Sequence, residues 1–236
     1  MKKLLNYFSK FEIALWSFSV LTIILSFALL ENEGYSTLVA SLVGVTSLIF
    51  IAKGNPVGQL LMIVFSIIYG AISYTFAYYG EMMTYLGMTL PMAVFSLVSW
   101  LKNPYNGNRA EVKVNKIGKN ERIFMWLATV AVTAIFYFIL EYFETNNLIP
   151  STVSVATSFL GAYLTFRRSP FLSLAYAAND VVLVVLWSLA SAQDLKYVSV
   201  TVCFVVFLFN DLYCFLNWQK MQKRQNLNDV KKENLT

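Results

Sequence analysis

Eight apolar stretches, each about as long as a membrane span, occupy most of this 236-residue sequence. They lie at residues 11–30, 35–52, 57–79, 82–101, 122–143, 149–166, 170–192 and 195–218. A helix that rises about 1.5 Å per residue needs about 20 apolar residues to cross ~30 Å of hydrocarbon. The composition agrees, because 58% of the residues are hydrophobic and only 13% are charged. The pattern predicts an all-α integral membrane protein with eight transmembrane helices in a lipid bilayer.

The charged residues between the stretches alternate in sign from one connection to the next. Lys and Arg collect on the cytoplasmic side of bacterial membrane proteins. If the N-terminus is cytoplasmic, every one of the 18 Lys and Arg residues except Lys196 falls on that side. The opposite connections then hold Glu31, Glu33, Glu81, Glu141, Glu144 and Asp194. We therefore expect a multi-pass protein of the bacterial cytoplasmic membrane, with both termini in the cytoplasm.

Several kinds of function are disfavoured by the residue types. The basic residues are spread over separate connections, which argues against a nucleic-acid partner. There is no His, and Cys203 and Cys214 both lie in the last stretch, so neither a metal site nor a disulfide framework is expected. The sequence has no phosphate-binding glycine loop. We therefore expect no enzyme activity, no catalytic residues and no cofactor.

The two halves of the chain resemble each other on either side of a polar connection at residues 102–121. The segment "STLVASLVGVTSLIFIAKGNP" at 36–56 resembles "STVSVATSFLGAYLTFRRSP" at 151–170. The same offset of 114 residues matches Asn103 with Asn217. Equivalent spans are separated by four crossings, so the two units point the same way through the membrane. Parallel repeats of this kind occur in transporters, with the solute site between the two bundles, as in SWEET proteins.

These matches predict a 3+1+3 organisation with one additional helix. The predicted parts are an extra transmembrane helix at 1–34, a first three-helix bundle at 35–103, a cytoplasmic loop and linker helix at 104–148, a second three-helix bundle at 149–219 and a cytoplasmic tail at 220–236.

Two carboxylates interrupt the apolar spans. Asp180 lies in "AYAANDVVLVVLW" and Asp211 in "FLFNDLYCFLNW", each preceded by an asparagine. A carboxylate at the centre of a membrane helix costs at least ~2.5–3.5 kcal/mol on insertion scales, which favours a functional role. Asn179 and Asn210 both lie roughly 12–13 Å from the predicted cytoplasmic ends of their helices, so the two pairs are level. They either bridge the helices as polar contacts or line a hydrated cavity, and both roles are compatible.

Aromatic and polar residues share helix faces with these pairs. Tyr176, Asp180 and Trp187 recur at helical spacing, and Asn210 and Tyr213 do the same on the last span. The first half offers Gln59, Thr89 and Ser96, whereas Trp100 and Trp218 at the span ends are interpreted as interfacial anchors. Such a pocket would suit a solute with a ribose-like part and a flat, cationic ring.

Three segments resemble the PnuC family of vitamin-precursor transporters. They are "NDVVLVVLW" at 179–187, "DLKYVSVTVCFVVFLFNDLYCFLNWQKM" at 194–221 and "GMTLPMAVFSLVSWLKNPY" at 87–105. The resemblance spans roughly residues 35–221 and implies the three-plus-one-plus-three fold related to SWEET. It also implies a homotrimer that takes up nicotinamide riboside by facilitated diffusion for NAD biosynthesis. A functionally coupled cytoplasmic kinase would trap the product by phosphorylation.

The resemblance and the helix faces together select the candidate substrate-binding residues. These are Asn210, Asn179, Asp180, Trp187, Tyr213, Asp211, Tyr176, Thr89 and Ser96. One departure affects the choice of solute, because many family members carry a second tryptophan near the start of the seventh span and "FLSLAYAAND" has none. Thiamine, riboflavin and nucleosides therefore stay open as alternative solutes. Two other classes also stay open, namely an intramembrane enzyme with Asp180 and Asp211 as paired acids and a scaffolding membrane protein.

Overall fold

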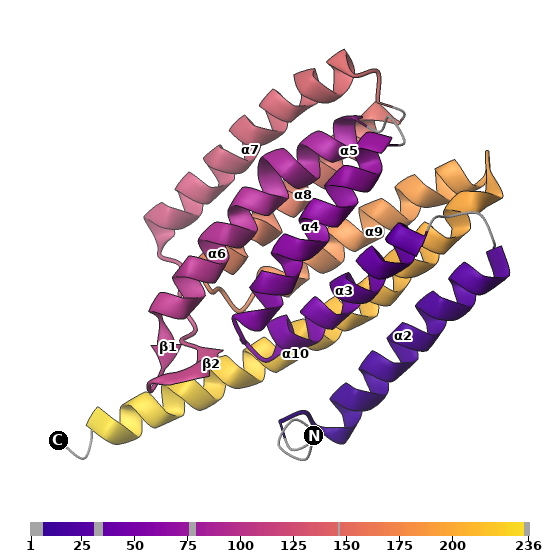
Figure 1. Cartoon of the computed structure of the whole chain (residues 1–236). Coiled ribbons are helices and arrows are strands. Elements are labelled where there is room, and N and C mark those ends of the chain that lie inside the picture. The colour runs from indigo at the N-terminus through magenta and orange to yellow at the C-terminus, as the bar shows by residue number, and fades with distance from the viewer. Residues whose placement is uncertain (1–6, 31–34, 76–78, 146, 234–236) are drawn as a thin grey trace.

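The computed structural model describes residues 7–30, 35–75, 79–145 and 147–233, and over these it is almost entirely helical (Figure 1). The helices are α2 (Lys10–Leu30), α3 (Tyr35–Ala52), α4 (Val57–Thr75), α5 (Tyr79–Thr84), η1 (Tyr85–Thr89), α6 (Leu90–Lys102), α7 (Lys119–Tyr142), α8 (Leu148–Phe166), α9 (Leu172–Ser191), η2 (Leu195–Tyr197) and α10 (Val198–Glu233). Two short strands, β1 (Pro104–Tyr105) and β2 (Asn108–Val112), pair antiparallel. Within these described ranges, eight helical segments are long and apolar enough to cross a membrane, which confirms the predicted count.

Six of the helices form a closed ring. Each of α3, α4, α6, α8, α9 and α10 packs against two neighbours in that order, and α10 returns to α3. The remaining two long helices lie at opposite edges of the molecule, α7 against α8 and α2 against α3 and α10 (Figure 1). We call the first set the six-helix ring. It contains α3, α4 and α6 from the first half of the chain and α8, α9 and α10 from the second half.

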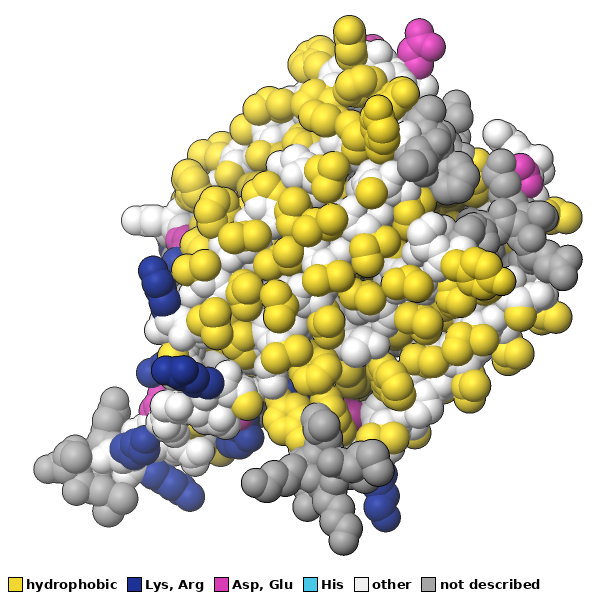
Figure 2. All heavy atoms as spheres, viewed as in Figure 1, with side chains coloured by type: hydrophobic (Ala, Val, Ile, Leu, Met, Phe, Trp, Pro, Cys, Tyr) yellow, Lys and Arg dark blue, Asp and Glu magenta, His cyan; other side chains and the backbone are white. Residues whose placement is uncertain are grey.

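Charged side chains gather at the two ends of the helices and leave an apolar belt between them (Figure 2). The end at which α2 begins and α10 ends also carries Lys53, Lys102, Arg109, Arg167 and Arg168, and we call it the basic end (Figure 1). The opposite end carries Glu141, Glu144 and Asp194, and we call it the acidic end. The belt is what a chain embedded in a bilayer needs, because hydrocarbon cannot solvate charge.

A π-turn interrupts the third helix of the ring. Residues 79–102 run as one helix, but Tyr85–Thr89 has the wider π geometry between α5 and α6. The Thr89 hydroxyl donates to the Thr84 carbonyl oxygen over 3.3 Å, five residues back. A π-turn costs hydrogen-bond quality and is frequent at functional sites. Here Thr84, Tyr85 and Thr89, at or next to the π-turn, line the cavity inside the ring.

The last helix continues well beyond the apolar region. The predicted tail at 220–236 is helical up to Glu233, and it packs along the β1–β2 hairpin of the connection between α6 and α7. The Gln225 amide donates to Glu111 and to the Val112 carbonyl oxygen and accepts from the Val114 backbone N–H. These contacts join the β1–β2 hairpin and the end of α10 into one compact unit at the basic end.

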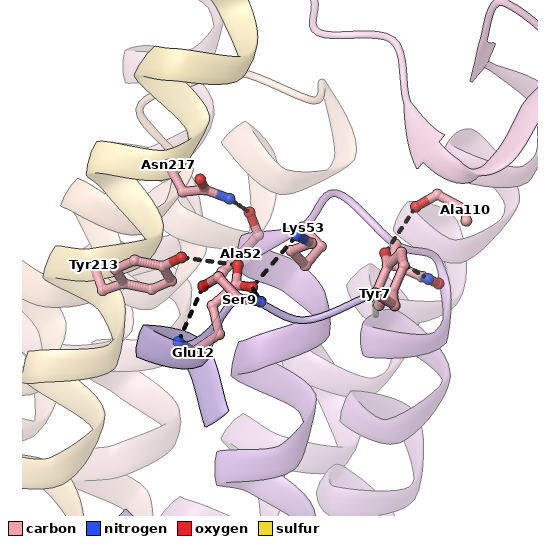
Figure 3. A network of polar contacts seen from close by, with 9 residues as sticks. Tyr7, Ser9, Glu12, Ala52, Lys53, Ala110, Tyr213 and Asn217 are labelled. Atoms are coloured by element: carbon pink, nitrogen blue, oxygen red, sulfur yellow. Dashed lines mark hydrogen bonds and ion pairs between the residues drawn. The ribbon is translucent and has the colours of Figure 1, made fainter. Parts of the chain in front are cut away.

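The additional helix α2 is fastened to the ring by a buried carboxylate, Glu12 (Figure 3). Glu12 accepts from the Tyr213 hydroxyl over 2.8 Å and from the Ser9 backbone N–H over 2.6 Å, and Lys53 approaches it to 3.4 Å. The Ser9 hydroxyl in turn accepts from the Glu12 N–H, which completes a capping box at the start of α2. Nearby, burial raises the pKa of the Tyr7 hydroxyl, which accepts from Asn55. Among the described residues Glu12 is thus a third buried carboxylate, besides Asp180 and Asp211, which were the two that the sequence analysis recognised.

The interpretation of Trp100 and Trp218 as interfacial anchors is wrong. Both side chains are 0% exposed and sit inside the six-helix ring at its basic end. Trp100 Nε1 donates to the Thr165 carbonyl oxygen, and Trp218 Nε1 donates to the Ile51 carbonyl oxygen, each over 2.9 Å. An indole N–H buried in protein needs an acceptor, and the last turns of α8 and α3 supply one.

Candidate functional site

A cavity of about 380 Å³ lies inside the six-helix ring. Near the acidic end its lining includes the exposed residues Tyr79, Glu144 and Gln193, so it reaches the surface there. Towards the basic end the cavity ends at Ile51 and Thr165, whose carbonyl oxygens accept hydrogen bonds from the indole N–H groups of the two buried tryptophans. Its volume falls in the ~300–1,000 Å³ range of small-molecule sites.

Hydroxyl groups from one face of α8 line one wall of this cavity. The wall residues Ser151, Ser154, Ser158 and Thr165 recur at spacings of three, four and seven, which places them along one side of a helix. The same spacing is visible in "STVSVATSFLGAYLT", but the sequence analysis used that segment only to find the repeat. The stripe supplies donors and acceptors that suit the hydroxyls of a sugar.

Two carboxylates from neighbouring helices meet at the wall formed by α9 and α10. Asp180 is 4% exposed and Asp211 is 3% exposed, and both line the cavity. Their carboxyl groups lie within hydrogen-bonding range of each other. The level placement expected from the sequence is confirmed, but the contact joins Asp to Asp instead of Asn to Asp.

Aromatic rings supply the flat surfaces of the cavity. Trp187 and Tyr176 reach it from α9, and Phe65 and Tyr85 reach it from the opposite side of the ring. The Phe65 and Tyr85 rings pack edge to face, with their centroids 5.8 Å apart. Stacked or edge-on aromatic groups bind flat rings, and they bind cationic rings more strongly.

Several polar atoms at this cavity have no hydrogen-bond partner among the residues that the structure describes. They are Gln59 Nε2, Thr145 Oγ1, Trp187 Nε1, Asp180 Oδ2 and Asp211 Oδ1. Buried polar atoms normally have partners, and a cluster of exceptions indicates a site that binds something polar. Gln59, which is only 2% exposed, was noted in the sequence but was not chosen as a candidate site residue.

The predicted site residues divide into two groups. Six of them line the cavity, namely Asn179, Asp180, Trp187, Asp211, Tyr176 and Thr89. The other three, Asn210, Tyr213 and Ser96, are not among its described lining residues. The Asn210 amide donates to the Ser19 hydroxyl of α2 over 2.9 Å, and the Tyr213 hydroxyl donates to Glu12. These two side chains therefore face the additional helix.

The charged residues among the described lining of the cavity are all acidic. The lining contains Asp180, Asp211 and Glu144, and among the described lining residues there is no Lys or Arg. No group of three or more Asp, Glu, Cys or His side chains that could hold a metal ion occurs in the described part of the chain. Asn179 Oδ1 accepts from Ser154 over 3.1 Å and from Thr157 over 2.9 Å, so this asparagine also joins α9 to α8. The cavity can accommodate a cationic or neutral solute with hydroxyl groups and a flat ring.

The chain resembles known proteins along most of its length. The model of the nicotinamide mononucleotide transporter family matches residues 34–220. The "Nicotinamide riboside transporter PnuC" of Neisseria mucosa is 24% identical over 230 residues, which cover 95% of this chain and 87% of that protein. The protein of the same description from Haemophilus influenzae is 22% identical over 202 residues, covering 82% and 83%.

The fold is also that of a solved structure, described as the crystal structure of the vitamin B3 transporter PnuC. The TM-score is 0.78, the sequence identity is 23%, and the match covers 92% of this chain and 94% of that one. The resemblance read from the sequence is therefore confirmed, and so is the eight-helix membrane fold. Because the family model matches residues 34–220, well over half of the sequence, this chain belongs to the nicotinamide mononucleotide transporter family.

Proposed function

We propose that this protein takes up nicotinamide riboside through the cavity of the six-helix ring by facilitated diffusion. The observation that carries the proposal is the composition of the cavity lining, which combines Asp180 and Asp211 with hydroxyl and aromatic groups and, within its described part, has no Lys or Arg. Nicotinamide riboside has a flat pyridinium ring with one positive charge and a ribose with free hydroxyls. Each part has a chemically matched set of groups in the lining.

The charge of the lining favours the riboside over the mononucleotide that gives the family its name. A phosphate group adds about −1.5 to −2 charge at neutral pH and needs Arg, Lys or clustered backbone N–H donors. The cavity offers carboxylates instead, which would repel the phosphate. The two relatives from Neisseria mucosa and Haemophilus influenzae are both described as nicotinamide riboside transporters, which supports the same choice.

The orientation follows from the distribution of charge. We infer that the basic end is cytoplasmic and that both termini lie there, in a bacterial cytoplasmic membrane. The cavity then reaches the outside at Tyr79, Glu144 and Gln193 and is closed on the cytoplasmic side by Trp100 and Trp218. This conformation would accept solute from outside.

Facilitated diffusion is sufficient to drive uptake of a monocation. A membrane potential that is negative inside contributes about 2.3 kcal/mol per elementary charge for each 100 mV. Phosphorylation by a cytoplasmic kinase would then give the product a net negative charge, and the acidic cavity would no longer accept it. The charge of the cavity would thus make trapping effective. The homotrimer implied by the family resemblance is part of the same proposal.

The test is uptake of labelled nicotinamide riboside into vesicles that contain the purified protein. We expect saturable uptake without ATP or an ion gradient, faster when the interior is made electrically negative. Unlabelled nicotinamide riboside should compete, whereas nicotinamide mononucleotide, thiamine, riboflavin and deoxynucleosides should compete poorly. Uptake that requires ATP or a sodium gradient would contradict facilitated diffusion. If one of the other solutes competes more strongly than nicotinamide riboside, that solute is the substrate instead.

A further inference from the structure

The contact between Asp180 and Asp211 is unusual because neither carboxylate has a basic partner in the described part of the chain. The two side chains come from α9 and α10, are almost fully buried and lie within hydrogen-bonding range of each other. Asp180 Oδ2 and Asp211 Oδ1 have no hydrogen-bond donor among the described residues. Elsewhere in this protein a buried carboxylate is well supported, since Glu12 accepts from Tyr213 and Ser9 and lies beside Lys53.

The neighbouring polar groups are already engaged or are weak donors. The Asn210 amide donates to Ser19 and to the Val206 carbonyl oxygen, on the side of α10 that faces α2. The Ser173 hydroxyl donates to the Cys214 sulfur over 2.6 Å. The Tyr176 hydroxyl and the Cys214 thiol are the other titratable groups near Asp211, and Tyr176 also lies beside Thr165. None of these groups supplies a positive charge.

Two ionised carboxylates cannot remain in contact under these conditions. Their like charges repel most strongly where water is excluded, and two carboxylate oxygens attract each other only when a proton lies between them. The aspartic proteases hold a proton between two carboxylates for the same reason. We infer that Asp180 and Asp211 act as one acid, which holds a single proton between them and presents a single negative charge to the cavity.

This inference deepens the proposed function and rests on it for the identity of the solute. A pair with one negative charge matches the single positive charge of the pyridinium ring and leaves no net charge in the buried part of the loaded cavity, since Glu144 lies at the exposed mouth. A pair with two negative charges would leave the loaded cavity anionic, at a depth where charge is costly. The shared proton therefore sets how many positive charges the site accepts, and the pair is a specificity determinant for monocations.

Infrared spectroscopy of the purified full chain measures the proton directly. We expect a carboxylic acid C=O band at neutral pH that shifts to lower frequency when the protein is made with aspartate carrying ¹³C in its side-chain carboxyl. The band should disappear in Asp180→Asn and in Asp211→Asn, because the new amide donates to the remaining carboxylate in place of the proton. Glu144→Gln, at the exposed mouth of the cavity, should retain it.

The spectra also give the outcomes that overturn the inference. A wild-type protein without an acid band, or with a band that is unaffected by labelled aspartate, would show that the pair holds no proton. A band that persists in either single variant would show an individually protonated residue instead of a shared proton. The labelled wild type gives its answer even if an asparagine variant does not fold.

Solute binding supplies an independent second readout. Each single variant keeps one carboxylate, so we expect it to keep its preference for nicotinamide riboside over the uncharged dihydronicotinamide riboside. In the double variant Asp180→Asn/Asp211→Asn, the preference for the charged riboside should fall at least about tenfold. This loss is far larger than the product of the factors by which the two single variants reduce the preference. If the loss of preference in the double variant equals the product of the losses in the two single variants, the inference that the pair acts as one acid is contradicted. If nicotinamide riboside does not bind to the wild type but the infrared results hold, the proposed function fails and the shared proton stands.

Discussion

The indole rings of Trp100 and Trp218 pack against each other at the basic end of the cavity, with centroids 5.5 Å apart and 53° between their planes. Each indole N–H donates to a backbone carbonyl oxygen in the opposite half of the chain. The acceptor is Thr165 for Trp100 and Ile51 for Trp218. The preceding residues repeat the pattern, because Ser99 donates to the Phe166 carbonyl oxygen over 2.8 Å. Asn217 donates likewise to the Ala52 carbonyl oxygen over 2.6 Å. The two halves of the ring thus close one end of the cavity by equivalent contacts.

Replacing Trp218 by Phe tests the strength of this closure. The variant Trp218→Phe keeps a ring in the pair but leaves the Ile51 carbonyl oxygen without its donor. We expect the free energy of unfolding to fall by about 1–3 kcal/mol, the cost of a buried group that loses its partner. Chemical denaturation in detergent measures it. Trp126→Phe is the matched control, since Trp126 is 54% exposed on α7 and should change stability by less than ~0.5 kcal/mol. Equal losses in both variants would contradict the prediction.

Trp187 and Asn210 should differ in their effect on solute affinity. Trp187 lines the cavity and its Nε1 has no acceptor among the described residues, so Trp187→Leu should raise the Kd for nicotinamide riboside by about tenfold. Asn210 faces Ser19, so Asn210→Ala should lower stability by about 1 kcal/mol and change the Kd less than about twofold. Calorimetric titration and thermal unfolding of both variants check this. A large rise in Kd for Asn210→Ala would restore that residue to the site.

Replacing Gln59 should make the protein more stable but weaken its binding of solute. The buried Gln59 Nε2 has no partner in the described structure, so Gln59→Met should raise the free energy of unfolding by about 1 kcal/mol and weaken solute binding. Gln225 is buried to the same degree but makes hydrogen bonds with Glu111, Val112 and Val114. Gln225→Met should therefore lower stability. If both methionine variants shift the unfolding midpoint in the same direction, Gln59 has no special role at the cavity.

Glu12 and Tyr213 should be energetically coupled. We expect Glu12→Gln and Tyr213→Phe each to destabilise the protein, because each breaks the contact that fastens α2 to α10. In a double-mutant cycle the coupling energy should be about 0.5–3 kcal/mol. Tyr197→Phe combined with Glu12→Gln is the control, since Tyr197 lies at the acidic end and the two effects should add. Additivity in the Glu12–Tyr213 cycle would show that the hydrogen bond contributes nothing to stability.

The repeat could be predicted from the sequence only approximately. The offset of 114 residues holds for the carbonyl acceptors, since Ile51 corresponds to Thr165 and Ala52 to Phe166. The predicted match of Asn103 with Asn217 is off by one helical turn, because the contacts make Ser99 the equivalent of Asn217. Short polar residues recur often in such spans, and only the partners across the ring distinguish one turn from the next.

The sequence by itself determined the number of spans, the alternation of charge between the two ends and the presence of costly carboxylates at one level. These follow from hydropathy and helix geometry, which act along the chain and need no tertiary contact. The tertiary structure alone decided which side chains meet. Asn210 and Asp211 are adjacent residues about 100° apart on α10, so one faces α2 and the other faces Asp180 across the cavity wall. That choice depends on how α10 is rotated between α9, α3 and α2, and packing sets that rotation.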